Sequence, residues 1–418
     1  MKIGMIGLGK LGLPVAVAIN LAGHDVMGYD VNRNLMKKNS TFKEQGPNGE
    51  DTFLPFLKKS SLKFGNIEKV IDHSEVVFVA VQTPHAEKYD GTKPIPYDRV
   101  DFDYSYVCSA LKEIAKIAKK KRKNIILVLI STVLPGTFKK EFEPLLNKYI
   151  KFCYNPFFIA MGTTMRDFLN PEFVLFGVKD LQAAKKVETL YKSLHDKKFY
   201  RTSIQNAELI KVSYNTFIGM KIAFVNTLME ICHKIPGSNV DEVTNALKLA
   251  DERLISTKYL TAGMGDGGGC HPRDNIALSW LAKKLNLSFD TFEMMMMARE
   301  RQSAWLVNLM TNYDLPKVIL GKAFKPETHL DLGSPSLLCK NLLIDMGYKV
   351  KIYDPYIDKK KIRFQKSVFL IGTQHKIFQN YKFPRGSVVI DPWRYIPINS
   401  QKGIKVIHVG VNTSIEKQ

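Results

Sequence analysis

The sequence predicts an α/β protein in which two parallel-sheet domains are joined by a long helix. The first half of the chain alternates short apolar runs with amphipathic stretches, and the same alternation restarts at about Lys317. Such alternation is typical of βαβ units on a parallel sheet. Between the two regions, residues 206–235 carry apolar side chains at helical spacings without a proline or a multiple-glycine break. A helix of that length extends about 45 Å, enough to bridge two domains.

The predicted strands are short apolar runs. In the first half they are KIGMIG, DVMGYD, VVFVAV, NIILVLI and IKFCYN, and a helix from about Leu11 to Leu21 follows the first of them. In the last part they are KVILG, KVKIYD, SVFLIGT, SVVIDPW and KVIHVG. A chain of 418 residues is long enough for two or three domains. We place them at residues 1–200, 201–305 and 306–418.

Composition indicates a soluble, cytoplasmic protein with packed cores, since 45% of residues are hydrophobic and no apolar run approaches a membrane-spanning length. The five cysteines are scattered and never form a C-x-x-C pair, which argues against a disulfide framework and a structural zinc site. We therefore expect no metal and no membrane partner. The net charge is +21, but the densest basic run, Lys119 to Lys123, closes a helical pattern. We interpret it as a solvated helix end, not as a nucleic-acid site.

A glycine pattern near the N-terminus predicts a dinucleotide site. Gly7, Gly9 and Gly12 are spaced G-x-G-x-x-G at the end of a predicted strand and the opening of a helix, and Asp30 ends the next strand. Glycines in this context permit a tight turn and close approach of a pyrophosphate, while the helix N-terminus favours negative charge. Asp30 would accept hydrogen bonds from ribose hydroxyls and repel a 2′-phosphate, which favours NAD over NADP. Arg33 lies nearby.

A second glycine cluster precedes a cysteine. The stretch GMGDGGGCHPRDN, residues 263–275, has five glycines in the seven residues before Cys270, and Asp274 follows four residues later. Three interpretations stay open from the residues alone: a tight structural turn, a metal loop, or a nucleophile that a bulky substrate must reach. In the third case, the glycines would allow substrate contacts with no Cβ in the way.

Six segments taken together are similar to the UDP-glucose/GDP-mannose dehydrogenase family. They are the N-terminal glycines, AVQTP, ISTVLPGT, AELIKVSYNTF, GGGCHPRD and GKAFKPETHLDLGSP, in the family's order over almost the whole chain. The resemblance implies a Rossmann NAD-binding domain (1–200), a long central helix in a helical dimerisation domain with the cysteine loop (201–305), and a Rossmann-like nucleotide-sugar domain (306–418). It also implies a homodimer or dimer-based oligomer that oxidises a sugar C6 hydroxyl to a carboxylate in two NAD-dependent steps.

The resemblance assigns five catalytic residues. Cys270 matches the nucleophile that forms a thiohemiacetal and then a thioester. Lys211 and Asn215, four apart on one helix face, would stabilise an oxyanion and orient a water or substrate hydroxyl. Asp274 matches the aspartate that assists the first deprotonation, and Thr132 a threonine near the nicotinamide and the catalytic water.

Binding residues follow from the same resemblance. The cofactor contacts are Gly7, Gly9, Leu11, Gly12, Asp30, Arg33, Thr83, Pro84 and Thr132. The substrate contacts are Phe158, Lys211, Asn215, Arg253, Tyr259, Gly267, Phe324, Lys325 and Arg394. Arg253 resembles an arginine that reaches the substrate of the neighbouring subunit, with an apparent shift of one residue.

The chain departs from the family pattern in two segments. Phe157 stands where the family has a glutamate, the usual base for thioester hydrolysis, and Met161 stands where many members have a second one. Three outcomes stay open: another group such as Asp274 takes that role, deacylation is slow, or the reaction stops at a different product. In KPETHLDLGSP, His329, Leu330 and Leu332 replace the usual D-D-x-R type of pattern, which removes an arginine.

The expected substrate is UDP-glucose, giving UDP-glucuronate. The spacing of GMGDGGGCHP is closer to the UDP-N-acetylhexosamine branch, whereas GTTMRDFLNPEFVLFG resembles the UDP-glucose branch, so a UDP-N-acetylhexosamine is the alternative. A hypothesis from another class is a catalytically impaired nucleotide-sugar-binding homologue. A one-step hydroxy-acid dehydrogenase would share the N-terminal fold but would not need the cysteine loop or the second α/β domain.

Overall fold

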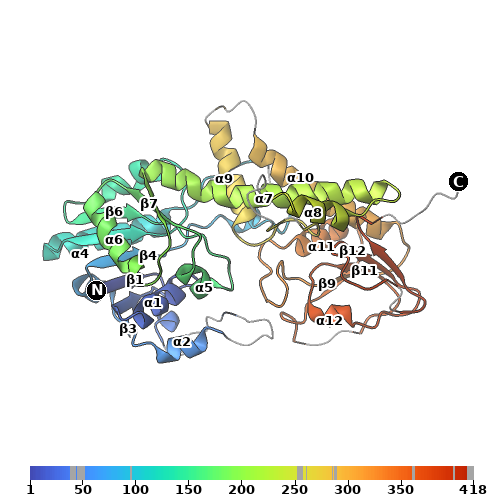
Figure 1. Ribbon diagram of the computed structural model, residues 1–418, viewed down its shortest axis with the longest axis horizontal. Helices are drawn as coiled ribbons and strands as arrows, with labels where there is room; N and C mark the ends of the chain where they lie inside the picture. Colours follow the sequence, from blue (N-terminus) through green and yellow to red (C-terminus); the bar gives the residue numbers. More distant parts are fainter. Residues whose placement is uncertain are drawn as a thin grey trace. The chain divides into compact units, whose positions relative to one another are not determined.

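The computed structural model describes residues 1–37, 44, 52–94, 97–251, 258–259, 261–284, 286, 290–359, 363–398 and 401–411, with the side chain of Thr227 left aside. The chain forms two compact units. The first comprises Met1–Pro84 and Phe102–Ser213, and the second His85–Asp101 and Tyr214–Gln418. Each unit contains one sheet (Figure 1).

The sheet of the first unit has eight strands in the order β3-β2-β1-β4-β5-β6-β7-β8. All neighbouring pairs are parallel except β6 and β7. The strands are β1 (Lys2–Ile6), β2 (Asp25–Tyr29), β3 (Lys63–Phe64), β4 (Val76–Val79), β5 (Ile125–Leu129), β6 (Ile150–Tyr154), β7 (Val174–Val178) and β8 (Phe199–Thr202). From β1 the chain adds strands β2 and β3 on one side and then β4 to β8 on the other, so the strand order reverses between β1 and β4. Open α/β sheets bind ligands at such a point.

The helices of the first unit pack on this sheet. They are α1 (Gly12–Leu21), α2 (Leu54–Lys59), α3 (Ile67–His73), α4 (Ser105–Lys121), α5 (Thr164–Leu169) and α6 (Leu181–Lys192), with short turns η1 (Arg33–Leu35), η3 (Phe138–Phe142) and η4 (Glu143–Leu145). The predicted basic run indeed closes α4, where Lys121 forms ion pairs with Glu68 and Asp72.

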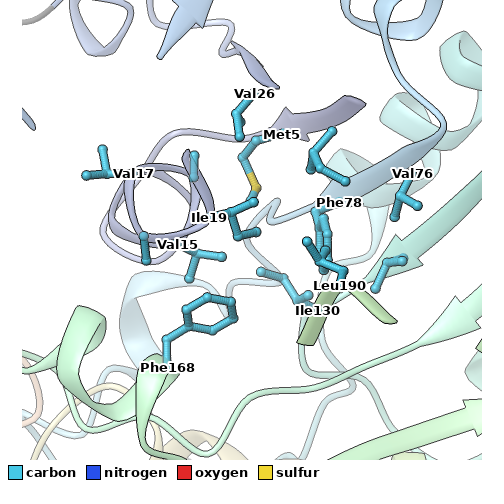
Figure 2. Packing of buried hydrophobic residues seen from close by; sticks show 14 of the residues in the cluster. Met5, Val15, Val17, Ile19, Val26, Val76, Phe78, Ile130, Phe168 and Leu190 are labelled. Carbon is cyan, nitrogen blue, oxygen red and sulfur yellow. The ribbon is translucent and has the colours of Figure 1, made fainter. Parts of the chain in front are cut away.

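The core of the first unit surrounds α1. This helix is apolar all round and buried from Gly12 to Asn20, as expected of a helix covered on every side. Figure 2 shows how its side chains meet those of the sheet and of the neighbouring helices, with Met5, Val15, Val17, Ile19, Val26, Val76, Phe78, Ile130, Phe168 and Leu190 labelled. The packing fixes the N-terminal end of α1 against the end of β1.

The sheet of the second unit has five parallel strands in the order β10-β9-β11-β12-β13. The strands are β9 (Lys317–Leu320), β10 (Val350–Tyr353), β11 (Val368–Ile371), β12 (Val388–Asp391) and β13 (Lys405–His408). Its other elements are η2 (Glu87–Tyr89), α8 (Val240–Lys248), α9 (His271–Lys284), α10 (Thr291–Thr311), α11 (Pro335–Asp345) and α12 (Lys376–Gln379). In this sheet the strand order reverses between β9 and β11.

The longest element, α7 (Ile204–Lys234), is the helix predicted at residues 206–235, and the division between the units falls within it, after Ser213. The predicted α/β class with two parallel sheets is confirmed. The segment His85–Asp101 lies early in the sequence but packs with the second unit, where Arg99 contacts Glu293 at 3.3 Å. Within the described ranges, none of the helices is both long and apolar enough to cross a membrane.

Candidate active site

The glycine turn after β1 has the geometry of a phosphate-binding loop. Gly7 has a φ of +92°, and a Cβ on it would lie 2.6 Å from the carbonyl oxygen of Ala80. A Cβ on Gly12 would lie 1.9 Å from the carbonyl oxygen of Gly7, so both positions require glycine. By contrast, a Cβ on Gly9 would meet nothing within 4 Å. Gly9 therefore faces open space at the N-terminus of α1, and Leu11, the residue before the helix, offers no side-chain acceptor to its amides.

Asp30 ends β2 beside this turn. Its Oδ2 accepts a 2.6 Å hydrogen bond from the backbone N–H of Leu8, and its Oδ1 a 2.7 Å bond from that of Asn32. The carboxylate is only partly buried, so it retains acceptor capacity for ribose hydroxyls. Arg33 is exposed at the start of η1. These residues fit NAD, whose pyrophosphate would lie against Gly9 and the start of α1.

Two predicted cofactor residues are joined at the ends of β4 and β5. The hydroxyl of Thr83 donates a 2.8 Å hydrogen bond to the carbonyl oxygen of Thr132, and Thr83 is buried. The hydroxyl of Ser131 donates to the carbonyl oxygen of Val81 in the same way. The two loops are thus tied together at the end of the sheet that also carries the glycine turn. Pro84 follows, and its carbonyl oxygen accepts from the N–H of Asp103 at 2.9 Å.

Lys211 on α7 is nearly buried, and its ammonium lies 5.4 Å from the centre of the Phe158 ring. Phe158 in turn packs on Phe173 at 4.8 Å between ring centres. A cation over an aromatic face is attracted electrostatically by the ring. The structure therefore brings together Lys211 and Phe158, both predicted as substrate contacts, within the first unit.

Glu208, one turn before Lys211, is a residue that the sequence reasoning missed. Its carboxylate is fully buried and accepts hydrogen bonds from the N–H groups of Gly136 (2.6 Å) and Phe138 (2.8 Å). Burial raises the pKa of Glu208 to about 7, although both hydrogen bonds oppose the shift. Glu208 therefore anchors the loop that follows Thr132 to the helix that carries Lys211. The only sequence signal was an acidic residue on the buried face of a helix.

Phe157 is partly buried and packs against the first unit's core. Its ring lies 5.3 Å from that of Phe168, and it packs against the buried cluster around α1. The position at which the family has a glutamate is therefore filled by an apolar side chain that contacts the core. Phe157 supplies no proton acceptor.

In the second unit, Cys270 directly precedes α9 and is partly exposed. The N–H of Asp274 donates a 2.8 Å bond to the carbonyl oxygen of Cys270, so the two residues share the first turn of the helix. Asp274 is fully buried; its Oδ2 accepts from the amide of Asn215 at 2.6 Å and its Oδ1 from Arg273 at 3.1 and 3.2 Å. Asn215 lies one turn after Lys211 on α7. Three predicted catalytic residues thus form one connected group.

His85 also belongs to this group and was not predicted. It interacts electrostatically with Arg273 and Asp274, and burial, aided by the Arg273 guanidinium, lowers the pKa of His85 to about 4. The imidazole is therefore neutral near pH 7. The signal in the sequence was only a histidine two residues after Thr83.

The glycine cluster before Cys270 serves packing within the second unit. A Cβ on Gly263 would lie 2.0 Å from the ring of Trp393, and one on Gly267 would lie 2.3 Å from the Cβ of Phe324. Gly268, at φ +86°, donates from its N–H to the carbonyl oxygen of Leu332 at 3.1 Å. In the structure these glycines leave room for the side chains of Phe324, Leu332 and Trp393. The expectation that they also give a substrate access to Cys270 stays a prediction.

Buried polar side chains also hold residues 263–266 of the cysteine loop by hydrogen bonds and an ion pair. The amide of Asn226 accepts from the N–H of Gly263 (2.9 Å) and donates to the carbonyl oxygen of Met264 (3.1 Å). The buried guanidinium of Arg299 pairs with the carboxylate of Asp266 (2.9 Å) and donates to the carbonyl oxygen of Gly333 (2.7 Å). Arg299 therefore connects the cysteine loop to the predicted nucleotide segment.

The remaining predicted substrate residues differ in their surroundings. Phe324 packs on the cysteine loop at Gly267, and Lys325 follows it in the same turn. Arg394 is engaged inside the unit, since it pairs with Asp241 at 2.8 and 2.9 Å and donates to the carbonyl oxygen of Ala262 at 2.8 Å. Tyr259 is 45% exposed, and Arg253 lies outside the described residues.

Three parts of the chain match models of one protein family. Residues 1–195 match the NAD binding domain of the UDP-glucose/GDP-mannose dehydrogenase family, residues 205–301 its central domain and residues 318–395 its UDP binding domain. The chain is 30% identical over 368 residues to UDP-glucose 6-dehydrogenase TuaD of Bacillus subtilis, covering 85% of this chain and 76% of that one. It is 27% identical over 381 residues to GDP-mannose 6-dehydrogenase of Pseudomonas aeruginosa, covering 87% and 83%.

Solved structures show the same fold. A UDP-glucose dehydrogenase from Pyrobaculum islandicum superposes with a TM-score of 0.84 at 24% identity, covering 98% of this chain and 97% of the other. A UDP-D-ManNAc dehydrogenase from Pyrococcus horikoshii superposes with a TM-score of 0.81 at 23% identity, covering 99% and 100%. The chain therefore belongs to the UDP-glucose/GDP-mannose dehydrogenase family and is an oxidoreductase that uses NAD as its cofactor.

Proposed function

We propose that the protein oxidises the C6 hydroxyl of a UDP-sugar to a carboxylate and that the sugar is glucose. The observation that carries the proposal is the group formed by Cys270, Asp274 and Asn215, because a one-step alcohol dehydrogenase has no need of a thiol next to its base. UDP-glucose is favoured over other sugars because the relatives at about 30% identity include UDP-glucose 6-dehydrogenases.

In the proposed mechanism, Gly9 and the start of α1 would hold NAD, which would supply the hydride acceptor for each of two oxidations. Asp274 receives the proton of the C6 hydroxyl, directly or through a water oriented by Asn215, as the alcohol becomes an aldehyde. The Cys270 thiol then adds to the aldehyde carbon and gives a thiohemiacetal. After the second oxidation the same sulfur holds the sugar as a thioester, and water releases the acid and restores the thiol.

Lys211 and Asn215 stabilise the negative charge that develops on oxygen in these steps. Lys211 is nearly buried, so its charge acts in a medium of low dielectric constant, where it is worth more than in water. The amide of Asn215 is held by Asp274 at 2.6 Å, which fixes the direction of its remaining groups. We assign to Lys211 the role of oxyanion partner and to Asn215 the role of orienting hydroxyl or water.

The release step needs a base in place of the glutamate that Phe157 replaces. We assign this role to Asp274, the carboxylate that lies one helical turn after the thiol. A single carboxylate would then serve both the alcohol oxidation and the hydrolysis. Limiting UDP-glucose with excess NAD should give two NADH per sugar, and one NADH per sugar would show that the reaction stops before the acid.

The second candidate substrate is a UDP-N-acetylhexosamine, which the spacing of the GMGDGGGCHP loop favours. A purified-protein assay of UDP-glucose, UDP-N-acetylglucosamine, UDP-N-acetylmannosamine and GDP-mannose with NAD and with NADP separates the candidates. NADH formation with UDP-glucose alone supports the proposal, and a preference for an acetylated sugar transfers it to the second candidate. Binding of UDP-sugars and NAD without NADH formation across the panel would favour a catalytically impaired homologue.

We also propose that the protein forms a homodimer through the second unit's part of α7. Phe217, Met220, Phe224 and Ile231 are between 40% and 54% exposed, and their spacing places them on one face of the helix. A contiguous apolar face of this kind is typical of a protein–protein interface. Sedimentation of the purified chain tests the proposal, and Phe224→Asp should shift the dimer to a monomer.

A further inference from the structure

The two units contain the same turn after the first strand of the sheet. In the first unit the N–H of Gly7, after β1, donates a 2.9 Å hydrogen bond to the carbonyl oxygen of Tyr29 at the end of β2. In the second unit the N–H of Gly321, after β9, donates a 2.7 Å bond to the carbonyl oxygen of Tyr353 at the end of β10. The two glycines have φ values of +92° and +100°. The turn that forms the dinucleotide site therefore recurs in the second unit.

An aspartate closes each turn in the same way. Asp30 follows β2 and accepts from the N–H of Leu8 at 2.6 Å and from that of Asn32, two residues on, at 2.7 Å. Asp354 follows β10 and occupies the corresponding place. Its Oδ2 accepts from the N–H groups of Lys322 (2.7 Å) and Ala323 (3.0 Å), and its Oδ1 from an N–H two residues on, at 2.8 Å.

The two aspartates differ in what else they bind. Asp30 is partly exposed, whereas Asp354 and its partner His375 are both fully buried. Nε2 of His375 lies 3.0 Å from Oδ2 of Asp354, and Nδ1 of His375 lies 2.9 Å from the N–H of Glu327. Because that N–H is a donor, Nδ1 must be the acceptor, so the proton of the ring is on Nε2 and points to Asp354.

Four donors bind the carboxylate of Asp354, three of them at Oδ2 and one at Oδ1. Although burial raises the pKa of Asp354, the hydrogen bonds from His375 and from the backbone outweigh it, and the net pKa is lowered. Because Asp354 is fully buried, its carboxylate is out of reach of a ribose hydroxyl, whereas Asp30 is only partly buried.

The segment held by this pair is the one expected to bind the nucleotide sugar. Residues 322 and 323 are bound by Asp354, Phe324 and Lys325 come next, and the N–H of Glu327 is bound by His375. Glu327 has a φ of +58°, and its carboxylate accepts from the N–H of Lys376 at 2.7 Å and from the hydroxyl of Tyr356. The turn is therefore fixed on both sides of Phe324 and Lys325.

We propose that Asp354 and His375 are positioning residues for nucleotide-sugar binding: they hold the Phe324–Lys325 turn in its binding conformation and do not touch the ligand. The inference rests on the proposed function, since it takes the second unit to bind a uridine nucleotide. The second unit thus uses the aspartate of a dinucleotide-type turn to shape its own backbone, and the first unit uses the equivalent aspartate to bind the cofactor.

The test is direct binding of UDP and of NAD to the full-length protein, measured by titration calorimetry for the wild type, Asp354→Asn, His375→Gln and the matched variant Asp30→Asn. The Asp354→Asn amide keeps the side chain's shape but turns one acceptor into a donor that faces backbone N–H groups. We expect UDP affinity to fall about tenfold or more, as for the loss of hydrogen bonds to a charged group, with NAD affinity within twofold of the wild type. Asp30→Asn should do the reverse.

His375→Gln is a second, milder test in case Asp354→Asn does not fold. A glutamine can still donate to Asp354, but it no longer accepts from the N–H of Glu327. Its UDP affinity should lie between those of the wild type and Asp354→Asn, and an unfolding midpoint above the assay temperature shows that the variant is folded during the titration. The inference is overturned if Asp354→Asn and His375→Gln bind UDP as the wild type does, if they lose NAD and UDP affinity equally, or if the wild type does not bind UDP. Failure of the wild type to produce NADH while UDP binding responds as expected would reject the proposed activity and leave the positioning role intact.

Discussion

The side-chain amide of Asn215 donates a 2.6 Å hydrogen bond to the carboxylate of Asp274, although 59 residues separate the two in the chain. The other carboxylate oxygen is bound by Arg273, and Asp274 itself is fully buried. The carboxylate proposed as the base is therefore held at both oxygens, one helical turn from the thiol.

Replacing Asp274 by asparagine should remove the proton acceptor while keeping the side chain's size. We expect kcat to fall by about 10²–10⁴, the usual contribution of a general base, with UDP affinity within twofold of the wild type. Steady-state NADH formation and UDP titration measure the two quantities. A kcat within a few-fold of the wild type would mean that another group takes the proton.

Replacing Cys270 by alanine should abolish acid formation, because no thioester can form. The serine variant should also form no measurable acid, since a hydroxyl is a much weaker nucleophile than a thiolate. Product analysis by chromatography, run together with NADH absorbance, shows whether a single oxidation survives. Normal yields of the acid from either variant would exclude the thioester mechanism.

Restoring the family glutamate by Phe157→Glu should not speed up the reaction. The Phe157 ring packs on Phe168 and the core around α1, so a carboxyl at this position loses apolar contacts and acquires a desolvation cost. We expect a loss of about 2 kcal/mol in the free energy of unfolding, measured by denaturant titration, with Phe157→Leu as the milder control. A faster release of acid without loss of stability would show that this position reaches the site.

The buried carboxyl of Glu208 should make stability depend on pH. It ionises near its ordinary value of 4.5 in the unfolded chain and at about 7 in the folded one, so the folded state holds an extra proton between these values. Stability relative to Glu208→Gln should therefore fall as the pH rises from about 4.5 to about 7, by about 3 kcal/mol in all at about 1.4 kcal/mol per pH unit. Unfolding titrations of both proteins across this range measure it. A difference that stays constant with pH would place the pKa of Glu208 at its ordinary value.

Gly267→Ala and Gly269→Ala form a matched pair in the cysteine loop. A Cβ at residue 267 would lie 2.3 Å from the Cβ of Phe324, which cannot move without its backbone, whereas one at residue 269 would lie 2.9 Å from the flexible tip of Leu332. Gly267→Ala should cost about 2 kcal/mol of stability or more and change the alkylation rate of Cys270, and Gly269→Ala should cost less. Equal effects at the two positions would contradict this account of the packing.

Features of the fold and the site could be predicted from the sequence where the residues in contact lie close together in the chain. Gly7, Gly12 and Asp30 were predictable because the turn, the helix start and the next strand lie within one βαβ unit. Glu208 was not, because its ligands, the N–H groups of Gly136 and Phe138, lie about 70 residues earlier in the chain. No periodicity or motif records such a contact.

The cysteine loop also packs on residues that lie far away in the sequence. Its motif indicated a reactive thiol, but the packing of its glycines on Phe324, Leu332 and Trp393 was not predicted, because these residues follow much later in the chain. The turns at Gly7 and Gly321 share a glycine after the first strand and a Tyr-Asp pair at the end of the next. The second lacks the G-x-G-x-x-G pattern, so their likeness became clear only from their hydrogen bonds.

The close packing of Gly267 against Phe324 has a consequence for protein engineering. Under the proposed function, Phe324 contacts the sugar nucleotide and Cys270 is the nucleophile, so a change of side-chain volume at Phe324 would press on the backbone of Gly267, three residues before Cys270. We therefore expect substrate selectivity and the reactivity of Cys270 to change together. Residues 263–270 and 324–333 should be varied, or transplanted between relatives, as a single cassette.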